Sequence, residues 1–126
     1  MPEQKCLFVT PIGSVDSPER KGMESISSVL SPICRQRKIT FYTAIDIPNP
    51  GSITEQLLTS LREDALVVAN LDGLNPNVMY EVGYRHALHK AMVVIAPKKT
   101  QLPFDIKDYR TIFYDDTILG LSLIHI

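Results

Sequence analysis

The feature that most constrains how this chain can fold is a pair of short, continuous apolar runs at residues 65–69 and 91–96. Both contain adjacent β-branched residues, and neither alternates apolar with polar positions. Such runs are typical of strands buried on both faces, which occur in parallel sheets covered by helices. The chain is therefore expected to form a parallel sheet with helices on both sides.

Three further strands are predicted, at residues 5–11, 39–44 and 111–114. Signals for the start of a helix lie between several of the predicted strands. Ser17 is suited to cap the first helix with Pro18 at its first position, and Pro32 is expected to kink or end that helix. Ser52 and Glu55 match a capping box for the second helix.

The third helix is predicted to begin with Asn75 as its N-cap and Pro76 at its first position. The alternation of elements argues for a three-layer α/β sandwich, with a flavodoxin-like parallel five-stranded sheet in the order 2-1-3-4-5. Ligands bind such sheets beyond the carboxyl ends of the strands, where the winding reverses, here between the first and third strands. Three loops are expected to converge there, at residues 11–16, 46–52 and 71–77.

The composition is that of one domain with a single core, since the chain has 126 residues and 44% of them are hydrophobic. A net charge of −1 gives no electrostatic basis for binding nucleic acid or an anionic membrane. The sequence has no transmembrane run or signal peptide, and Cys6 and Cys34 belong to no CxxC or Cys/His cluster. A cytoplasmic protein with reduced, packed cysteines is expected.

The last six residues, 121–126, match the peptide that a common transposon sequencing adapter encodes in one reading frame. They predict a truncated reading frame, with a native domain over residues 1–120, a non-native tail and no final helix after the last strand. The alternative is an ordinary apolar C-terminal strand.

Glu81 is the leading candidate for catalysis, because it is expected in the third helix near the carboxyl edge of the sheet, beside an apolar stripe formed by Tyr84 and Leu88. The helix N-terminus is expected to keep its carboxyl ionised at neutral pH. A half-buried carboxylate there can act as a nucleophile or a general acid or base, whereas the alternative is an exposed ion pair with Arg85. Gly83, unfavourable within a helix, predicts a close approach by backbone or ligand.

The segment 71–88, Leu-Asp-Gly-Leu-Asn-Pro-Asn-Val-Met-Tyr-Glu-Val-Gly-Tyr-Arg-His-Ala-Leu, resembles the signature of nucleoside 2-deoxyribosyltransferase-like proteins, which are relatives of the Toll/interleukin-1-receptor (TIR) domains that cleave NAD. The resemblance implies a hydrolase or glycosyltransferase without a cofactor, in which Glu81 attacks the anomeric carbon of NAD or of a (deoxy)nucleoside or its monophosphate. It extends over about residues 5–116 through weaker motifs at 8–13, 17–20, 50–53, 103–105 and 110–115.

The family also has partner carboxylates, at positions that here correspond to Asn75 and Gln56. An amide cannot act as a general acid, which argues against exchange of deoxyribose between bases. Asp72 is the remaining candidate partner, or alternatively belongs to an Asp-Gly turn.

The converging loops supply candidate substrate-binding residues. Gly13 and Ser14 offer donors to a phosphate or ribose, although a tight turn explains the glycine equally well. Asn77 is expected to bond a sugar hydroxyl or to help cap the helix, and Arg20 to reach a phosphate or remain a solvated charge. The other candidates are Pro11, Ile12, Asp46, Ser52, Asn75 and Tyr84.

Two functions remain open at this stage. The first is an enzyme that acts on the N-glycosidic bond of a small-molecule nucleotide. The second is a non-catalytic nucleotide-binding, TIR-like signalling or assembly module, as a homo-oligomer or fused to further domains. No metal site is predicted, since His86 and His89 lack a third ligand.

Overall fold

The computed structural model describes residues 3–47, 53–102 and 109–115. The strands are β1 (Gln4–Val9), β2 (Ile39–Thr43), β3 (Leu66–Asn70), β4 (Met92–Pro97) and β5 (Thr111–Tyr114). The α-helices are α1 (Pro18–Gln36), α2 (Ile53–Glu63) and α3 (Pro76–Ala87), and two 3-10 helices are η1 (Ala44–Asp46) and η3 (Asp72–Leu74). The predicted tail at residues 121–126 and the predicted cap Ser52 lie outside the described residues.

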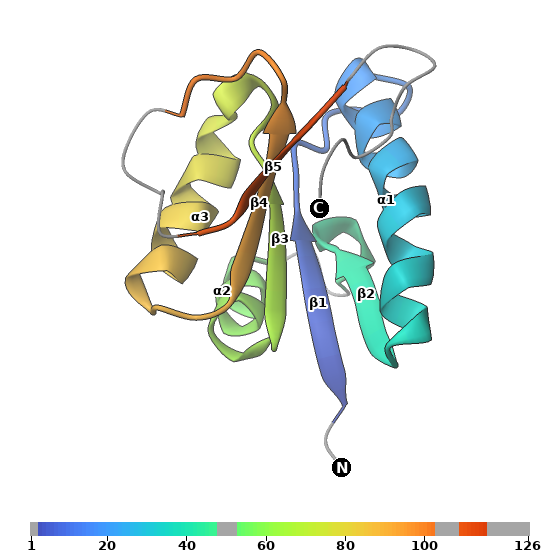
Figure 1. The fold of residues 1–126 in the computed structure, drawn as a ribbon. Coiled ribbons are helices and arrows are strands. Elements are labelled where there is room, and N and C mark those ends of the chain that lie inside the picture. Colours follow the sequence, from blue (N-terminus) through green and yellow to red (C-terminus); the bar gives the residue numbers. More distant parts are fainter. Residues whose placement is uncertain (1–2, 48–52, 103–108, 116–126) are drawn as a thin grey trace.

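The strands form one parallel sheet in the order β2-β1-β3-β4-β5, so the predicted topology is confirmed (Figure 1). The winding reverses between β1 and β3, which are hydrogen-bonded neighbours. The loops that follow these two strands therefore leave the sheet side by side.

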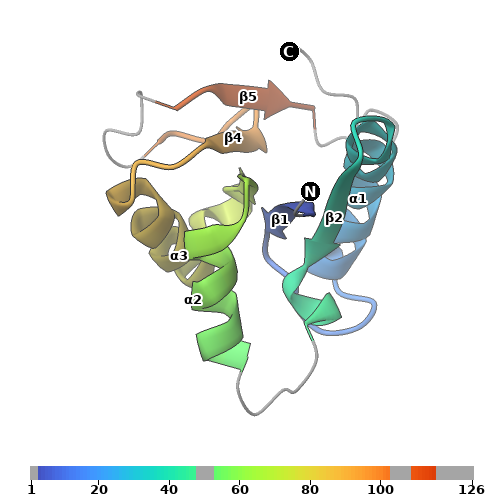
Figure 2. The same cartoon turned by 90° about the horizontal axis from the view of Figure 1, so that it is seen from below.

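The sheet separates two apolar layers, with α2 and α3 on one face and α1 on the other (Figure 2). Successive side chains of β1 alternate between them: Leu7 and Val9 pack in the layer with α2 and α3, whereas Cys6 and Phe8 pack in the layer with α1. Cys34 lies in the α1 layer too, and both thiols are buried and free. The strand is buried on both faces.

The predicted start of α1 is confirmed, because the Ser17 hydroxyl accepts the N–H of Arg20 at 3.1 Å. The helix does not end at Pro32 but continues to Gln36. Pro32 deprives the carbonyl of Ser28 of a partner, and Ser28 is exposed, so water reaches that carbonyl. None of the described helices is long and apolar enough to span a membrane.

A fully buried arginine, Arg85, fastens α3 to the rest of the layer. Its Nη1 donates to the carbonyl of Leu61 at 2.8 Å, at the end of α2, and its Nε and Nη2 donate to the carbonyl of Ala91 at 3.2 and 2.8 Å. The side chain thus bonds the two segments that flank α3. The alternative of an exposed ion pair between Glu81 and Arg85 is wrong, because Arg85 is directed into the core.

Replacing Arg85 with methionine should lower the free energy of unfolding by about 3 kcal/mol, because the buried carbonyl of Leu61 loses this donor and Ala91 loses two of its hydrogen bonds. Urea denaturation followed by circular dichroism measures this loss. Arg62→Met, which removes an exposed arginine at the end of α2, should leave the free energy of unfolding nearly unchanged. Equal effects of the two substitutions would contradict the role assigned to Arg85.

Candidate active site

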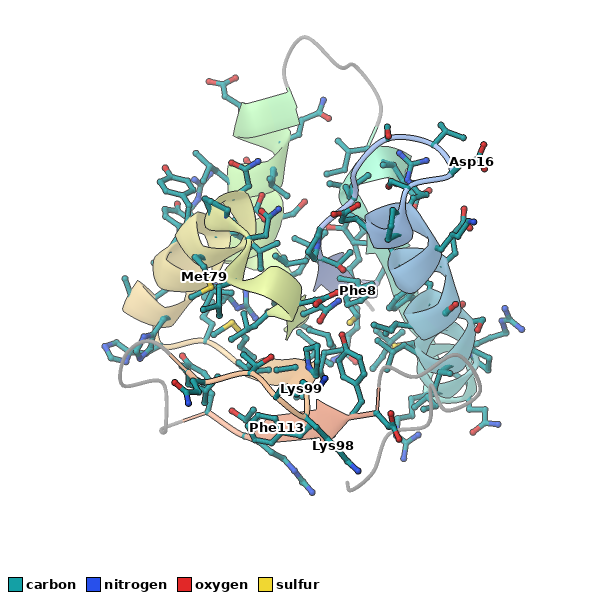
Figure 3. The ribbon with its side chains drawn as sticks, turned by 90° about the horizontal axis from the view of Figure 1, so that it is seen from above. Phe8, Asp16, Met79, Lys98, Lys99 and Phe113 are labelled. Carbon is teal, nitrogen blue, oxygen red and sulfur yellow. The ribbon has the colours of Figure 1, made fainter. Side chains whose placement is uncertain are left out.

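A cavity of about 440 Å³ opens at the carboxyl edge of the sheet, beside the end of β1. Its walls come from β1, from the loop that follows it, and from α2 and α3. Figure 3 looks down on this edge, with Phe8, one of the lining residues, between α3 and α1. The volume is within the range of small-molecule sites. The cavity therefore lies at the predicted switch point.

The structure brings six of the predicted site residues to this cavity and leaves four others away from its walls. Those that line it are Pro11, Ile12, Gly13, Asn75, Asn77 and Glu81. Those that do not are Ser14, Asp46, Asp72 and Tyr84. Ser52 lies outside the described residues.

Glu81 lies in the second turn of α3 and is half-buried in the cavity wall. Burial raises the pKa of its carboxyl from 4.5 to about 7. The expectation that the helix N-terminus would keep it ionised at neutral pH is therefore wrong, because desolvation outweighs that effect.

Asn75 caps α3, as predicted. Its Oδ1 accepts the backbone N–H of Asn77 at 2.9 Å and that of Val78 at 3.2 Å. The amide oxygen is thus engaged in holding the start of the helix that carries Glu81.

The loop after β1 is held in one shape by Gly13 and Arg20. Gly13 has φ of +61°, and a Cβ there would overlap the hydroxyl of Ser17, which caps α1. Arg20 donates from Nε to the carbonyl of Ile12 at 3.3 Å and from Nη2 to that of Gly13 at 3.2 Å. Arg20 therefore bonds the loop that lines the cavity and is not the free, solvated charge considered from sequence.

Two predicted acids have structural partners away from the cavity. The carboxylate of Asp46 accepts the N–H of Thr43 at 3.0 Å and its hydroxyl at 3.4 Å, which caps η1. Asp72 is exposed in η3, and its backbone N–H donates to Asn70 Oδ1 at 3.2 Å. Among the described residues that line the cavity, Glu81 is the one carboxylate.

The tyrosine that lines the cavity is not the predicted one, Tyr84. The hydroxyl of Tyr84 accepts from Arg62 Nη1 at 3.1 Å, between α3 and α2. Tyr80 lines the cavity instead, with 65% of its surface exposed. Sequence reasoning missed Tyr80, although its position three residues after Asn77 places it on the same helical face as that lining residue.

Gly83 makes no close approach, because a Cβ built on it would meet nothing within 4 Å. The expectation of a close backbone approach at this glycine is wrong. Within the described ranges, no group of three or more histidine, cysteine, aspartate or glutamate side chains could hold a metal ion.

Two glycine substitutions should have opposite effects. Gly13→Ala should lower the free energy of unfolding by about 1–2 kcal/mol, because the new methyl group meets Ser17 in a left-handed backbone. Gly83→Ala should raise it by about 1 kcal/mol, because alanine is the better helix former and open space surrounds it. Chemical denaturation of both variants measures the difference, and a change of the same sign in both would contradict it.

Glu81→Gln should stabilise the fold at neutral pH. A raised pKa means that the folded protein binds more protons than the unfolded chain between pH 4.5 and about 7, so its stability falls across that window as pH rises. The variant lacks this loss and should be more stable by about 2 kcal/mol at pH 8, after a discount for the solvent that reaches the group. Denaturation at pH 4 and pH 8 tests this, and an equal difference at both pH values would refute it.

No protein-family model and no curated protein matches the sequence. Solved structures do match. The 2-deoxyribosyltransferase of Leishmania mexicana aligns with a TM-score of 0.58 at 15% identity, over 97% of this chain and 79% of its own.

Two further structures align over 89% of this chain. The 2-deoxyribosyltransferase of Bacillus psychrosaccharolyticus has a TM-score of 0.65 at 13% identity, over 86% of its chain. The CMP N-glycosidase of Clostridium botulinum has a TM-score of 0.61 at 15% identity, over 90% of its chain. The resemblance found in the motifs is therefore confirmed at the level of architecture: the chain has the fold of the 2-deoxyribosyltransferases and of a CMP N-glycosidase.

Proposed function

We propose that the protein cleaves or transfers the N-glycosidic bond of a nucleoside or nucleotide, with Glu81 as the nucleophile. The observation that carries the proposal is a half-buried carboxyl in the wall of a 440 Å³ cavity at the switch point of the sheet. The fold shared with two 2-deoxyribosyltransferases and a CMP N-glycosidase supports the same class of reaction.

The reaction follows the logic of retaining glycoside hydrolysis. An oxygen of the Glu81 carboxylate forms a bond with C1′ while the C1′–N bond breaks and its electron pair leaves with the base. Water or a second base then attacks C1′, and the carboxylate is released. A proton from the attacking water or base balances the proton that the departing base takes up.

The surroundings of Glu81 suit this role. Val78 and the leucines of α2 that line the cavity are apolar, so a positive charge that develops on the sugar is attracted strongly to the ionised carboxylate. None of the described residues that line the cavity is a lysine or arginine. The cavity therefore suits an uncharged base and sugar, with any phosphate directed toward its mouth.

The absence of a second acid from the described lining favours one alternative, a module that binds a nucleotide without cleaving it. The positions of the family's partner carboxylates hold Asn75 and Gln56, and Asp72 lies outside the cavity. A leaving base that needs a proton would then have to obtain it from solvent, because Glu81 must be ionised to attack. NAD as a substrate rests on the likeness of the central motif to the TIR domains.

Chromatography of free base after incubation with 2′-deoxycytidine, CMP or NAD tests the proposal. Glu81→Gln should reduce base release by about a thousandfold or more, because an amide cannot form the glycosyl intermediate. For the parent, kcat/KM should rise about tenfold per pH unit up to pH 7 and level off above pH 8, since the ionised form attacks.

Glu63→Gln, an exposed glutamate at the end of α2, is the matched control and should leave base release unchanged. Turnover by Glu81→Gln at the parent's rate would refute the nucleophile. Calorimetric binding of one of the three ligands without base release would instead identify the protein as the binding module.

A further inference from the structure

Three buried polar side chains form a chain of hydrogen bonds at the carboxyl edge of the sheet. Thr10, Asn70 and Tyr114 are only 7%, 3% and 2% exposed. Thr10 directly follows β1, and Asn70 and Tyr114 are the last residues of β3 and β5. The hydroxyl of Tyr114 donates to Asn70 Oδ1 at 2.8 Å, and Asn70 Nδ2 donates to Thr10 Oγ1 at 3.0 Å. Buried polar groups of this kind are expensive unless bonded, so their arrangement is strongly specified.

The direction of the chain is fixed by a backbone group. The N–H of Asp72 lies 3.2 Å from Asn70 Oδ1, and a backbone N–H can only donate. The atom facing it must therefore be the amide oxygen, which leaves the NH₂ of Asn70 facing Thr10. A hydroxyl that accepts from an NH₂ has its own hydrogen left to donate elsewhere.

That hydrogen has no acceptor in the described part of the chain. Among the described residues, the side chain of Thr10 makes one hydrogen bond, in which it accepts from Asn70. Thr10 lines the cavity that also contains Glu81. Its free donor therefore belongs to a residue of the cavity wall.

We infer that the Thr10 hydroxyl donates a hydrogen bond to an acceptor oxygen or nitrogen of the bound nucleoside, and that Asn70 and Tyr114 are positioning residues that orient it. The inference rests on the proposed function and adds a substrate-binding residue to it. Thr10 contacts the ligand, whereas Tyr114 acts through Asn70.

The contact is made in both the ground state and the transition state, so its loss should appear mainly in KM. With whichever of 2′-deoxycytidine, CMP and NAD the parent cleaves, Thr10→Val should raise KM about five- to tenfold with kcat nearly unchanged. Thr10→Ser, which keeps the hydroxyl, should remain within about twofold of the parent.

The positioning role of Tyr114 is tested by combining its substitution with that of Thr10 and comparing the effects on KM. Tyr114→Phe should raise KM about two- to threefold alone, and should add nothing in a Thr10→Val background, because the oriented hydroxyl is already absent. Two controls share residue type but lie outside the cavity lining: Thr43→Val, a buried threonine at the end of β2, and Tyr42→Phe, whose hydroxyl donates to Asp64. Both should leave KM unchanged.

Thermal unfolding of each variant separates misfolding from lost binding. If Thr10→Val does not fold, the KM values of Thr10→Ser and Tyr114→Phe, compared with those of the parent and the controls, decide whether the inference holds. An unchanged KM in Thr10→Val overturns the inference while the proposed function stands, as does an equal loss in Thr10→Ser and Thr10→Val. If the parent binds without turnover, Kd replaces KM with the same expected changes. If the parent neither binds nor cleaves any of the three ligands, both proposals fall.

Discussion

The parallel pairing of β1 with β3 is the constraint on which the candidate site depends. Its register sets Val9 beside Ala69, so the next residues, Thr10 and Asn70, reach the same edge and bond to each other. Since both faces of β1 are buried, a slip of one residue would move Leu7 into the wrong apolar layer. The hydrophobic pattern therefore fixes the register, and the register brings together the two loops that border the cavity.

Glu81 shows how burial and backbone electrostatics compete within one helix. A helix N-terminus favours a carboxylate by at most about 1 kcal/mol at ordinary sites, and the effect fades beyond the first turn. Glu81 lies in the second turn and is half-buried, so desolvation dominates and raises its pKa to about 7. The position that places the carboxyl in the cavity wall therefore also makes its negative charge destabilising to the folded protein.

The sequence predicted features that are specified locally and missed those specified by packing. Ser17 and Asn75 were identified as caps because capping depends on the few residues that follow them. Glu81 was placed correctly because a helix after a buried strand must begin at the carboxyl edge. The direction of Arg85 was not predictable, since its acceptors, Leu61 and Ala91, belong to other elements. Tyr80 and Tyr84 are about one helical turn apart; Tyr84 bonds Arg62 of α2, whereas Tyr80 lines the cavity.

Ligand entry acts on Glu81 in two opposite directions. A nucleoside that displaces water from the cavity further disfavours the carboxylate, whereas a sugar that gains positive charge as its C1′–N bond breaks favours it. Under the proposed reaction, the charge of Glu81 is therefore stabilised most where the reaction needs it, in the transition state, and least in the complex that precedes it. An exposed carboxylate would be solvated equally in both states and would gain little from the change. The instability that Glu81 imposes on the fold and its suitability as a nucleophile thus have one physical origin.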